Sequence, residues 1–186
     1  MDIPQAVRHD IMVINDDYVK NAADHYNFWT QHVRFVVNEA KLLADAYQAD
    51  REIVCLGALL HDIALMSCVG TRSEHHTVGC RLAEGILTGY GYPAERLQRV
   101  LGCVLHHRSS KNAENIEELC VADADILAHY DNIPMCFHMA YKSGITDIEA
   151  LRDYFTIDYR NLSEQTREVF KPRFEQIMEV LFGSFC

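Results

Sequence analysis

Residues 53–65 read IVCLGALLHDIAL, an apolar run that leads to the adjacent pair His61-Asp62 and continues with three apolar residues. The nearly uniform apolar character of residues 51–66 predicts a helix at the centre of the fold. Polar side chains that project from such a segment are costly to bury unless they find partners, and a metal ion is one such partner. This stretch therefore predicts both the core and the place of a functional group.

Helical periodicity continues on both sides of this segment. Between Asp24 and Tyr47, apolar residues recur at three- and four-residue spacing. Ser73 is expected to cap a helix that runs to about Thr88, where a Gly-Tyr-Gly-Tyr-Pro sequence ends it. Pro172 is expected to kink or divide the last helix. The further helices are expected at residues 94–107, 116–130, 134–142, 147–161 and 163–182.

These segments predict an all-α fold: one compact domain over residues 1–186, with about eight helices. No alternating β-branched run between hairpin turns occurs, so we expect no substantial sheet. Residues 131–186 are interpreted as a helical C-terminal extension. Its last two helices either complete the core, which is the preferred interpretation, or form a contact in a homodimer.

Composition and charge exclude several classes of partner. The 186 residues include 17 Lys plus Arg and 27 Asp plus Glu, which gives a net charge of -10. Such a field repels phosphate backbones and anionic lipids, so we expect neither nucleic acid nor a membrane as partner. No apolar stretch is long enough to span a bilayer, and the N-terminus lacks the pattern of a signal peptide. Seven cysteines without a C-x-x-C pair indicate free thiols in a reducing cytoplasm.

Potential metal ligands surround the central segment in the sequence. The chain has two His-Asp dipeptides, and the first, His9-Asp10, lacks other ligand-type residues at helical spacing from its histidine. The second follows the buried helix, and candidate ligands stand on the neighbouring helices. Mixed imidazole and carboxylate ligation suits a divalent first-row metal. The candidates around this second dipeptide are His32, His75, His76, His106, His107, Asp123 and Asp125; of these, Asp123 is interpreted as a helix-surface acid or a partner of a ligand.

The order and helix spacing of these residues resemble the HD-domain superfamily of metal-dependent phosphohydrolases. The resemblance rests on WTQHVRFV (29–36), GALLHDIAL (57–65) and ADADIL (122–127), and it covers about residues 29–130. It implies that the first metal is bound by His32, His61, Asp62 and Asp125.

The same resemblance implies a second metal, bound by histidines of the two intervening helices. HHTVG (75–79) resembles the family's H-x-x-x-G helix start, which favours His75 over His76. In VLHHRSS (104–110) either His106 or His107 can point inward, because adjacent helical residues diverge by about 100°. The expected set takes His106 as the ligand. The resemblance also implies that Asp62 bridges the two metals, and Asp62, His75 and His106 are the expected catalytic residues.

One departure from the family concerns phosphate binding. Many relatives continue HD-x-G-K, whereas this chain reads His61-Asp62-Ile63-Ala64-Leu65 and therefore lacks the cation. Other side chains close in sequence to the expected ligands can hold a substrate phosphate instead. The expected substrate-binding residues are Arg34, Arg72, His76, His107, Arg108 and Lys111.

The expected reaction is hydrolysis of a phosphoester in a nucleotide or another small phosphorylated metabolite, by a metal-activated water. The expected cofactor is one or two divalent ions, Mn, Fe, Co, Ni or Zn. Two alternatives stay open: a di-iron oxygenase on the same ligand set, and a non-catalytic module that binds a metal or a nucleotide.

Overall fold

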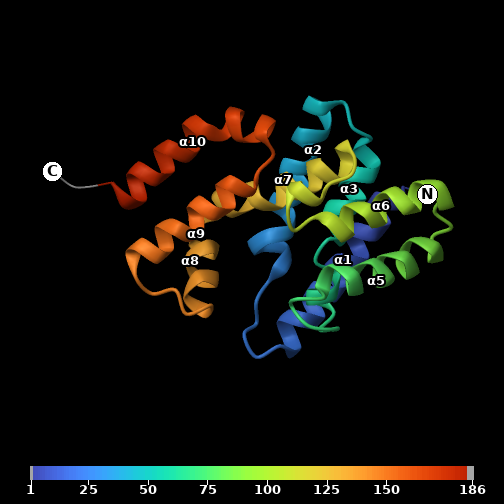
Figure 1. Ribbon diagram of the computed structural model, residues 1–186. Helices are drawn as coiled ribbons and strands as arrows, with labels where there is room; N and C mark the ends of the chain where they lie inside the picture. Colours follow the sequence, from blue (N-terminus) through green and yellow to red (C-terminus); the bar gives the residue numbers. More distant parts are fainter. Residues whose placement is uncertain (1, 184–186) are drawn as a thin grey trace.

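A computed structural model describes residues 2–183 of the chain, and its secondary structure is helical throughout that range (Figure 1). The all-α class expected from the sequence is confirmed. The α-helices are α1 Ile3–Asn21, α2 Arg34–Tyr47, α3 Arg51–Leu60, α4 Ile63–Met66, α5 His75–Gly89, α6 Ala94–His106, α7 Ile116–Asp131, α8 Ile133–Lys142, α9 Ile148–Asn161 and α10 Glu164–Phe182. A π-helical turn, η1 Trp29–Val33, precedes α2, and a short 3-10 turn, η2 Ser110–Asn112, precedes α7.

Helix α3 forms the centre of the core, as its composition predicts. Asp50 caps its N-terminus by accepting hydrogen bonds from the backbone N–H groups of Glu52 and Ile53, and every residue from Ile53 to Leu60 is buried. Helices α1, α2, α6 and α7 pack around it. Gly57 permits the close approach of α6, because a Cβ at this position would lie 2.5 Å from the Cβ of Cys103. The core therefore depends on a side-chain-free position inside its central helix.

Helices α2 and α7 form the most extensive helix pair of the fold. Residues of the site lie on α7 and on the turn η1 that leads into α2. The sequence predicts a single helix over residues 24–47. The structure instead has an irregular segment, then the π turn η1, and only from Arg34 a regular α-helix. A π turn contains more backbone than an α-helical turn, and such bulges are frequent at functional sites.

The N-terminal helix α1 was missed by the sequence analysis. It packs against α3 and α4, and its buried residues are Val7, Ile11 and Asn15. A stripe of two apolar residues and one asparagine gives a weak periodic signal. The start of the helix was the feature that could have predicted it, because Asp2 caps the first turn and Pro4 lies in that turn.

The predicted cap of α5 is wrong, and one of the two effects expected of Pro172, division of the last helix, does not occur. Ser73 does not cap α5: its hydroxyl contacts Thr71, and Thr71 donates a hydrogen bond to Glu74, which occupies the cap position. Pro172 does not divide α10, which runs continuously from Glu164 to Phe182.

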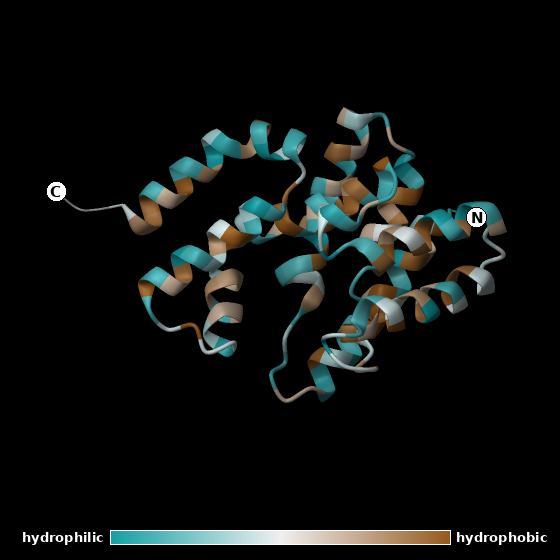
Figure 2. Ribbon diagram, in the orientation of Figure 1, coloured by the Kyte–Doolittle hydropathy of each residue, from teal (hydrophilic) through white to brown (hydrophobic). Residues whose placement is uncertain are grey.

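The C-terminal helices α8, α9 and α10 lie to one side of the bundle, and α10 extends away from it (Figure 1). Figure 2 shows hydrophilic and hydrophobic residues interspersed along α10. Its apolar residues pack on α9, where the Phe174 ring stacks on Tyr159 at 3.9 Å between centroids, and Phe170 contacts Tyr130 of α7. Asp123 anchors the start of α10 by accepting hydrogen bonds from the Ser163 N–H and hydroxyl and from the Thr166 hydroxyl.

Within residues 2–183, no helix combines the length and the apolar composition that crossing a membrane requires. The six cysteines of this range are all free thiols. The seventh, Cys186, lies outside the described residues.

Candidate metal centre

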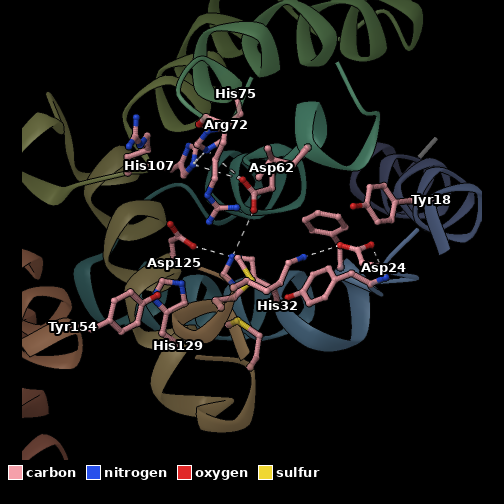
Figure 3. A pocket seen from close by; sticks show the side chains of 17 residues that line it. Tyr18, Asp24, His32, Asp62, Arg72, His75, His107, Asp125, His129 and Tyr154 are labelled. Atoms are coloured by element: carbon pink, nitrogen blue, oxygen red, sulfur yellow. Dashed lines mark hydrogen bonds and ion pairs between the residues drawn. The ribbon is translucent and has the colours of Figure 1, made fainter. Parts of the chain in front are cut away.

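Five helical elements bring histidines and aspartates to one cavity. His32 lies in the π turn η1, His61 ends α3, and Asp62 stands at the break between α3 and α4. Asp62 adopts φ -105° and ψ 17°, the sparsely populated bridge region in which active-site residues are often found. Asp125 projects from the middle of α7 toward His32 (Figure 3). Because elements far apart in sequence meet here, this is the point where the fold assembles a site.

The first group contains His32, His61, Asp62 and Asp125. The Nε2 atom of His32 lies 2.9 Å from Asp125 Oδ1 and 3.2 Å from His61 Nε2. Asp62 Oδ2 lies 3.5 Å from His61 Nε2 and 3.9 Å from His32 Nε2. Ligand atoms about 2.1 Å from one ion are separated by about 3 to 4 Å from one another, so this spacing suits a shared divalent metal.

A second group lies on the other side of Asp62 and contains His75 and His107. Their Nε2 atoms are 3.0 Å apart. Asp62 Oδ1 lies 3.4 Å from His75 Nε2 and 3.9 Å from His107 Nε2. The two carboxylate oxygens of Asp62 therefore face different groups, Oδ2 the first and Oδ1 the second, as a carboxylate that bridges two ions would.

The orientation of the rings tests whether a metal fits. Backbone carbonyl oxygens of Ala58, Arg72 and Val104 lie 2.6–2.7 Å from the Nδ1 atoms of His61, His75 and His107, respectively. A carbonyl oxygen only accepts, so each Nδ1 carries a proton, and in the neutral form of each ring the lone pair lies at Nε2. Two lone pairs that face each other at 3.0 Å repel unless a cation lies between them. The donor set therefore fits a metal in both groups.

The charges of the site agree with this interpretation. Burial opposes the ionisation of Asp62 and Asp125, but the neighbouring imidazoles hold the pKa of both carboxyl groups well below its usual range. Burial and the charge on His61 lower the pKa of His107 to about 4. At neutral pH the site thus contains ionised carboxylates and a neutral His107, the forms that bind a metal. Burial lowers the pKa of His61, but the charges of Asp62 and Asp125 raise it to about 9. His61 is therefore protonated without a metal, and a bound metal would displace this proton.

His107 takes the place that the sequence analysis gave to His106. His107 is buried at the end of α6, whereas the His106 ring turns outward and its Nδ1 lies 2.7 Å from Glu118 Oε2. The expectation that His106 faces the site is therefore wrong, and His107 is the candidate ligand, because the two side chains diverge by about 100° around the helix. His75, by contrast, is the member of its pair that faces the site.

The structure brings only some of the expected substrate-binding residues to the cavity. Arg72 and Arg108 line it, and Figure 3 shows Arg72 reaching toward the space between Asp62 and Asp125. His76 lines a separate hollow with His106 and Arg108. Two further expectations are corrected, because Arg34 is exposed and stacks on Phe35, and Lys111 reaches Asn161 on the surface.

The cavity in front of the two groups has a volume of about 330 Å³. Residues from the segment before η1 form one wall and residues of α8 and α9 form the other. Leu65 lines it at the position where many HD-x-G-K relatives carry a lysine. Burial raises the pKa of Tyr26 and Tyr154 well above the usual tyrosine value, so both phenols stay neutral. The apolar and aromatic lining consists of Tyr18, Tyr26, Phe28, Leu65, Met135, Met139 and Tyr154.

Two residues at the cavity were missed by the sequence analysis. His129 follows Asp125 by one helical turn on α7, and its Nδ1 lies 2.8 Å from Asp158 Oδ2 of α9. The four-residue spacing from Asp125 was the available signal, since residues at i and i+4 share a helix face. Asp158 gave no comparable signal, because its approach to His129 depends on the packing of α9 on α7. Asp123 lies on the opposite face, where it holds α10 rather than the site.

Comparison with known proteins agrees with this geometry. The family model of the HD domain matches residues 29–129, which is more than half of the chain. The chain therefore belongs to the HD domain family. Its fold is similar to the crystal structure of a predicted HD superfamily hydrolase from an uncultured Thermotogales bacterium, with a TM-score of 0.59 and 20% identity over 92% of this chain and 91% of that one. No curated protein matches the chain in sequence.

Proposed function

We propose that this protein is a metal-dependent phosphohydrolase that cleaves a phosphoester of a nucleotide or another small phosphorylated metabolite. Membership of the HD domain family supports a metal-dependent hydrolase, and the crystal structure with the similar fold is described as that of a predicted HD superfamily hydrolase. The phosphoester is our own extension of that coarser class, and it is supported by the chemistry of the cavity.

The observation that carries the proposal is the division of Asp62 between two groups of lone-pair donors. One oxygen faces His32 and His61, and the other faces His75 and His107. Divalent metals in such a site lower the pKa of a bound water and neutralise charge on a phosphoryl group. His32, His61, Asp62 and Asp125 would hold the first ion, and Asp62, His75 and His107 the second.

The protein's own side chains supply the remaining functions. Arg72 and Arg108 line the cavity and offer positive charge to a phosphate, although the net charge of the chain is -10. A guanidinium group suits a phosphate because its N–H groups donate to two oxygens at once. The apolar and aromatic side chains of the walls lower the local dielectric constant, which strengthens these charge interactions. The cavity of about 330 Å³ leaves room for a metabolite of modest size.

The experiment that tests the proposal combines metal analysis with turnover. Protein purified without chelator is analysed for bound elements, then assayed for phosphate release from a panel of nucleoside monophosphates and sugar phosphates, beside Asp62→Asn. We expect bound metal and turnover in the wild type and loss of both in the variant. A metal-loaded wild type that releases no phosphate from any compound, or an Asp62→Asn protein that keeps its turnover, would reject the proposal.

A second candidate has one observation in its favour. Leu65 occupies a place on the cavity wall where many family members offer a lysine to phosphate, and the six donors suit two irons equally well. Iron as the dominant bound element together with oxygen consumption would therefore favour the di-iron oxygenase.

A further inference from the structure

His129 and Asp158 form a hydrogen-bonded pair at the edge of the cavity, and neither belongs to the ligand set described above. His129 lies on α7 one turn beyond Asp125, and Asp158 lies on α9 one turn beyond Tyr154. The 2.8 Å contact between His129 Nδ1 and Asp158 Oδ2 joins the two helices beside the first group. Figure 3 shows the His129 side chain near Asp125 and Tyr154. The pair thus extends the site toward a part of the chain that the HD domain match does not cover, since α9 begins after residue 129.

His129 remains accessible from the cavity. Its side chain is 24% exposed and that of Asp158 is 22% exposed, and His129 lines the cavity together with Tyr154. Its ring stacks on His32 at 5.5 Å between centroids. Because the carboxylate of Asp158 engages Nδ1, the opposite edge of the ring, with Nε2, is the edge left for a ligand. A histidine in which one nitrogen is fixed by a carboxylate has a defined orientation.

The position of His129 favours a substrate contact over a metal ligand. The ligand-type group that contains His129 includes His32 and Asp125, but neither His61 nor Asp62 belongs to it. An ion held by His32, His61, Asp62 and Asp125 already has four protein ligands, and a catalytic ion keeps positions open for water and substrate. Such an ion would not need His129 as a ligand, so the ring edge that carries Nε2 is available to a substrate.

We propose that His129, positioned by Asp158, hydrogen-bonds an oxygen atom of the bound phosphorylated substrate, so that α9 completes the binding site. This inference rests on the proposed function and adds to it a substrate contact that the HD motif residues do not provide. Tyr154, one turn before Asp158, lines the same wall and places the organic part of the ester next to this contact. The C-terminal helices thus contribute to substrate recognition.

The test compares four variants of the full-length protein: His129→Ala, His129→Gln, Asp158→Asn and, as a matched control, His9→Gln on the exposed surface of α1. Metal content and thermal unfolding are measured first. Binding of inorganic phosphate to the metal-loaded proteins is then measured by titration calorimetry, and KM and kcat on the best phosphoester of the panel follow.

We expect all four variants to keep the metal content of the wild type. His129→Ala should weaken phosphate binding about tenfold or more, which is the usual effect of losing a hydrogen bond to a charged group. His129→Gln, whose amide can reach the place of Nε2, should recover part of the affinity. Asp158→Asn should raise KM more than it lowers kcat, because it loosens the ring without removing it, and His9→Gln should behave like the wild type.

Each other outcome has a defined meaning. Loss of metal in His129→Ala would overturn the proposal and make His129 a ligand. Phosphate affinity equal to that of the wild type in His129→Ala would overturn the contact while leaving the proposed function intact. A metal-loaded wild type that binds no phosphate and has no turnover would reject the proposed function itself, and with it the contact.

Discussion

His75 and His107 point their Nε2 atoms at each other across 3.0 Å, although they stand at opposite ends of different helices. Each ring is fixed by a hydrogen bond from Nδ1 to a backbone carbonyl three residues earlier in the chain. The local backbone therefore sets the tautomer, and the pairing of α5 with α6 sets the distance. Neither helix alone would present this pair of lone pairs.

The first prediction concerns the adjacent residues at the end of α6. His107→Ala should lower the bound metal by about one equivalent, because it removes a ligand of the second group. His106→Ala should keep the metal content of the wild type, since its ring contacts Glu118 outside the cavity. Elemental analysis of the two proteins after identical purification checks this. Metal loss in His106→Ala alone would contradict the geometry of α6.

The second prediction concerns Asp62. Asp62→Asn should abolish binding at both positions, because one carboxylate serves both groups, whereas His75→Ala should affect only the second. Titration with Mn²⁺ or Zn²⁺ distinguishes the two variants by stoichiometry. Retention of one tightly bound ion in Asp62→Asn would show that the carboxylate does not bridge.

The third prediction concerns metal removal. Chelation should lower the melting temperature of the wild type, because a metal that binds only the folded state stabilises it by mass action. The shift should be smaller in His107→Ala, and re-addition of metal should reverse it. Scanning calorimetry with and without chelator measures the effect. An unchanged melting temperature in the wild type would argue against a metal that bridges these helices.

The fourth prediction concerns packing at the centre of the core. Gly57→Ala should destabilise the fold by about 1 to 3 kcal/mol, because the new Cβ would collide with Cys103 on α6. Gly85 is the matched control: it is exposed on α5, and a Cβ there meets no atom within 4 Å. Gly85→Ala should therefore stabilise the protein by up to about 1 kcal/mol. Urea denaturation of the two variants gives both values, and equal effects would refute the close approach.

The fifth prediction concerns the pH dependence of stability. Burial and the adjacent carboxylate of Asp131 raise the pKa of Glu39 to about 7, against 4.5 for the unperturbed group. Between these values the folded state binds more protons than the unfolded state, so this group's contribution to stability falls as the pH rises. Glu39→Gln should therefore stabilise the protein at pH 8 relative to the wild type and have little effect at pH 5. Because Glu39 is only partly buried, we expect a gain on the order of 1 kcal/mol. Denaturation at both pH values tests this, and an equal effect at pH 5 and pH 8 would contradict it.

The sequence predicted the elements that carry strong periodic signals. The helices from α6 onward lie close to their expected bounds, because their apolar stripes and caps are local features. The central segment expected over residues 51–66 begins at Arg51 but is divided, because α3 ends at Leu60 and α4 begins only at Ile63. Helix α1 was not predicted, because its stripe of buried residues is narrow and contains Asn15. The π turn η1 was not predicted either, because no local sequence rule distinguishes it from the start of α2.

The candidate site was predictable in its outline but not in its side-chain directions. His32, His61, Asp62, His75 and Asp125 share the order and spacing of a family motif, and the structure brings them together. The choice between His106 and His107 depends on the rotation of α6 about its axis, which contacts with α5 and α7 determine. The pairing of His129 with Asp158 depends on how α9 docks on α7, which a pattern within one helix does not encode.

The break between α3 and α4 that places Asp62 between two groups also has a topological consequence. An ion bound there fastens together segments that stand almost a hundred residues apart, from His32 to Asp125, without any covalent bond between them. In a chain whose described cysteines are all unpaired, such an ion acts as a reversible cross-link. Because its ligands come together only in the folded chain, such an ion adds its binding free energy to the stability of the fold. The concentration of available metal would then set the stability of the fold as well as the activity of the protein.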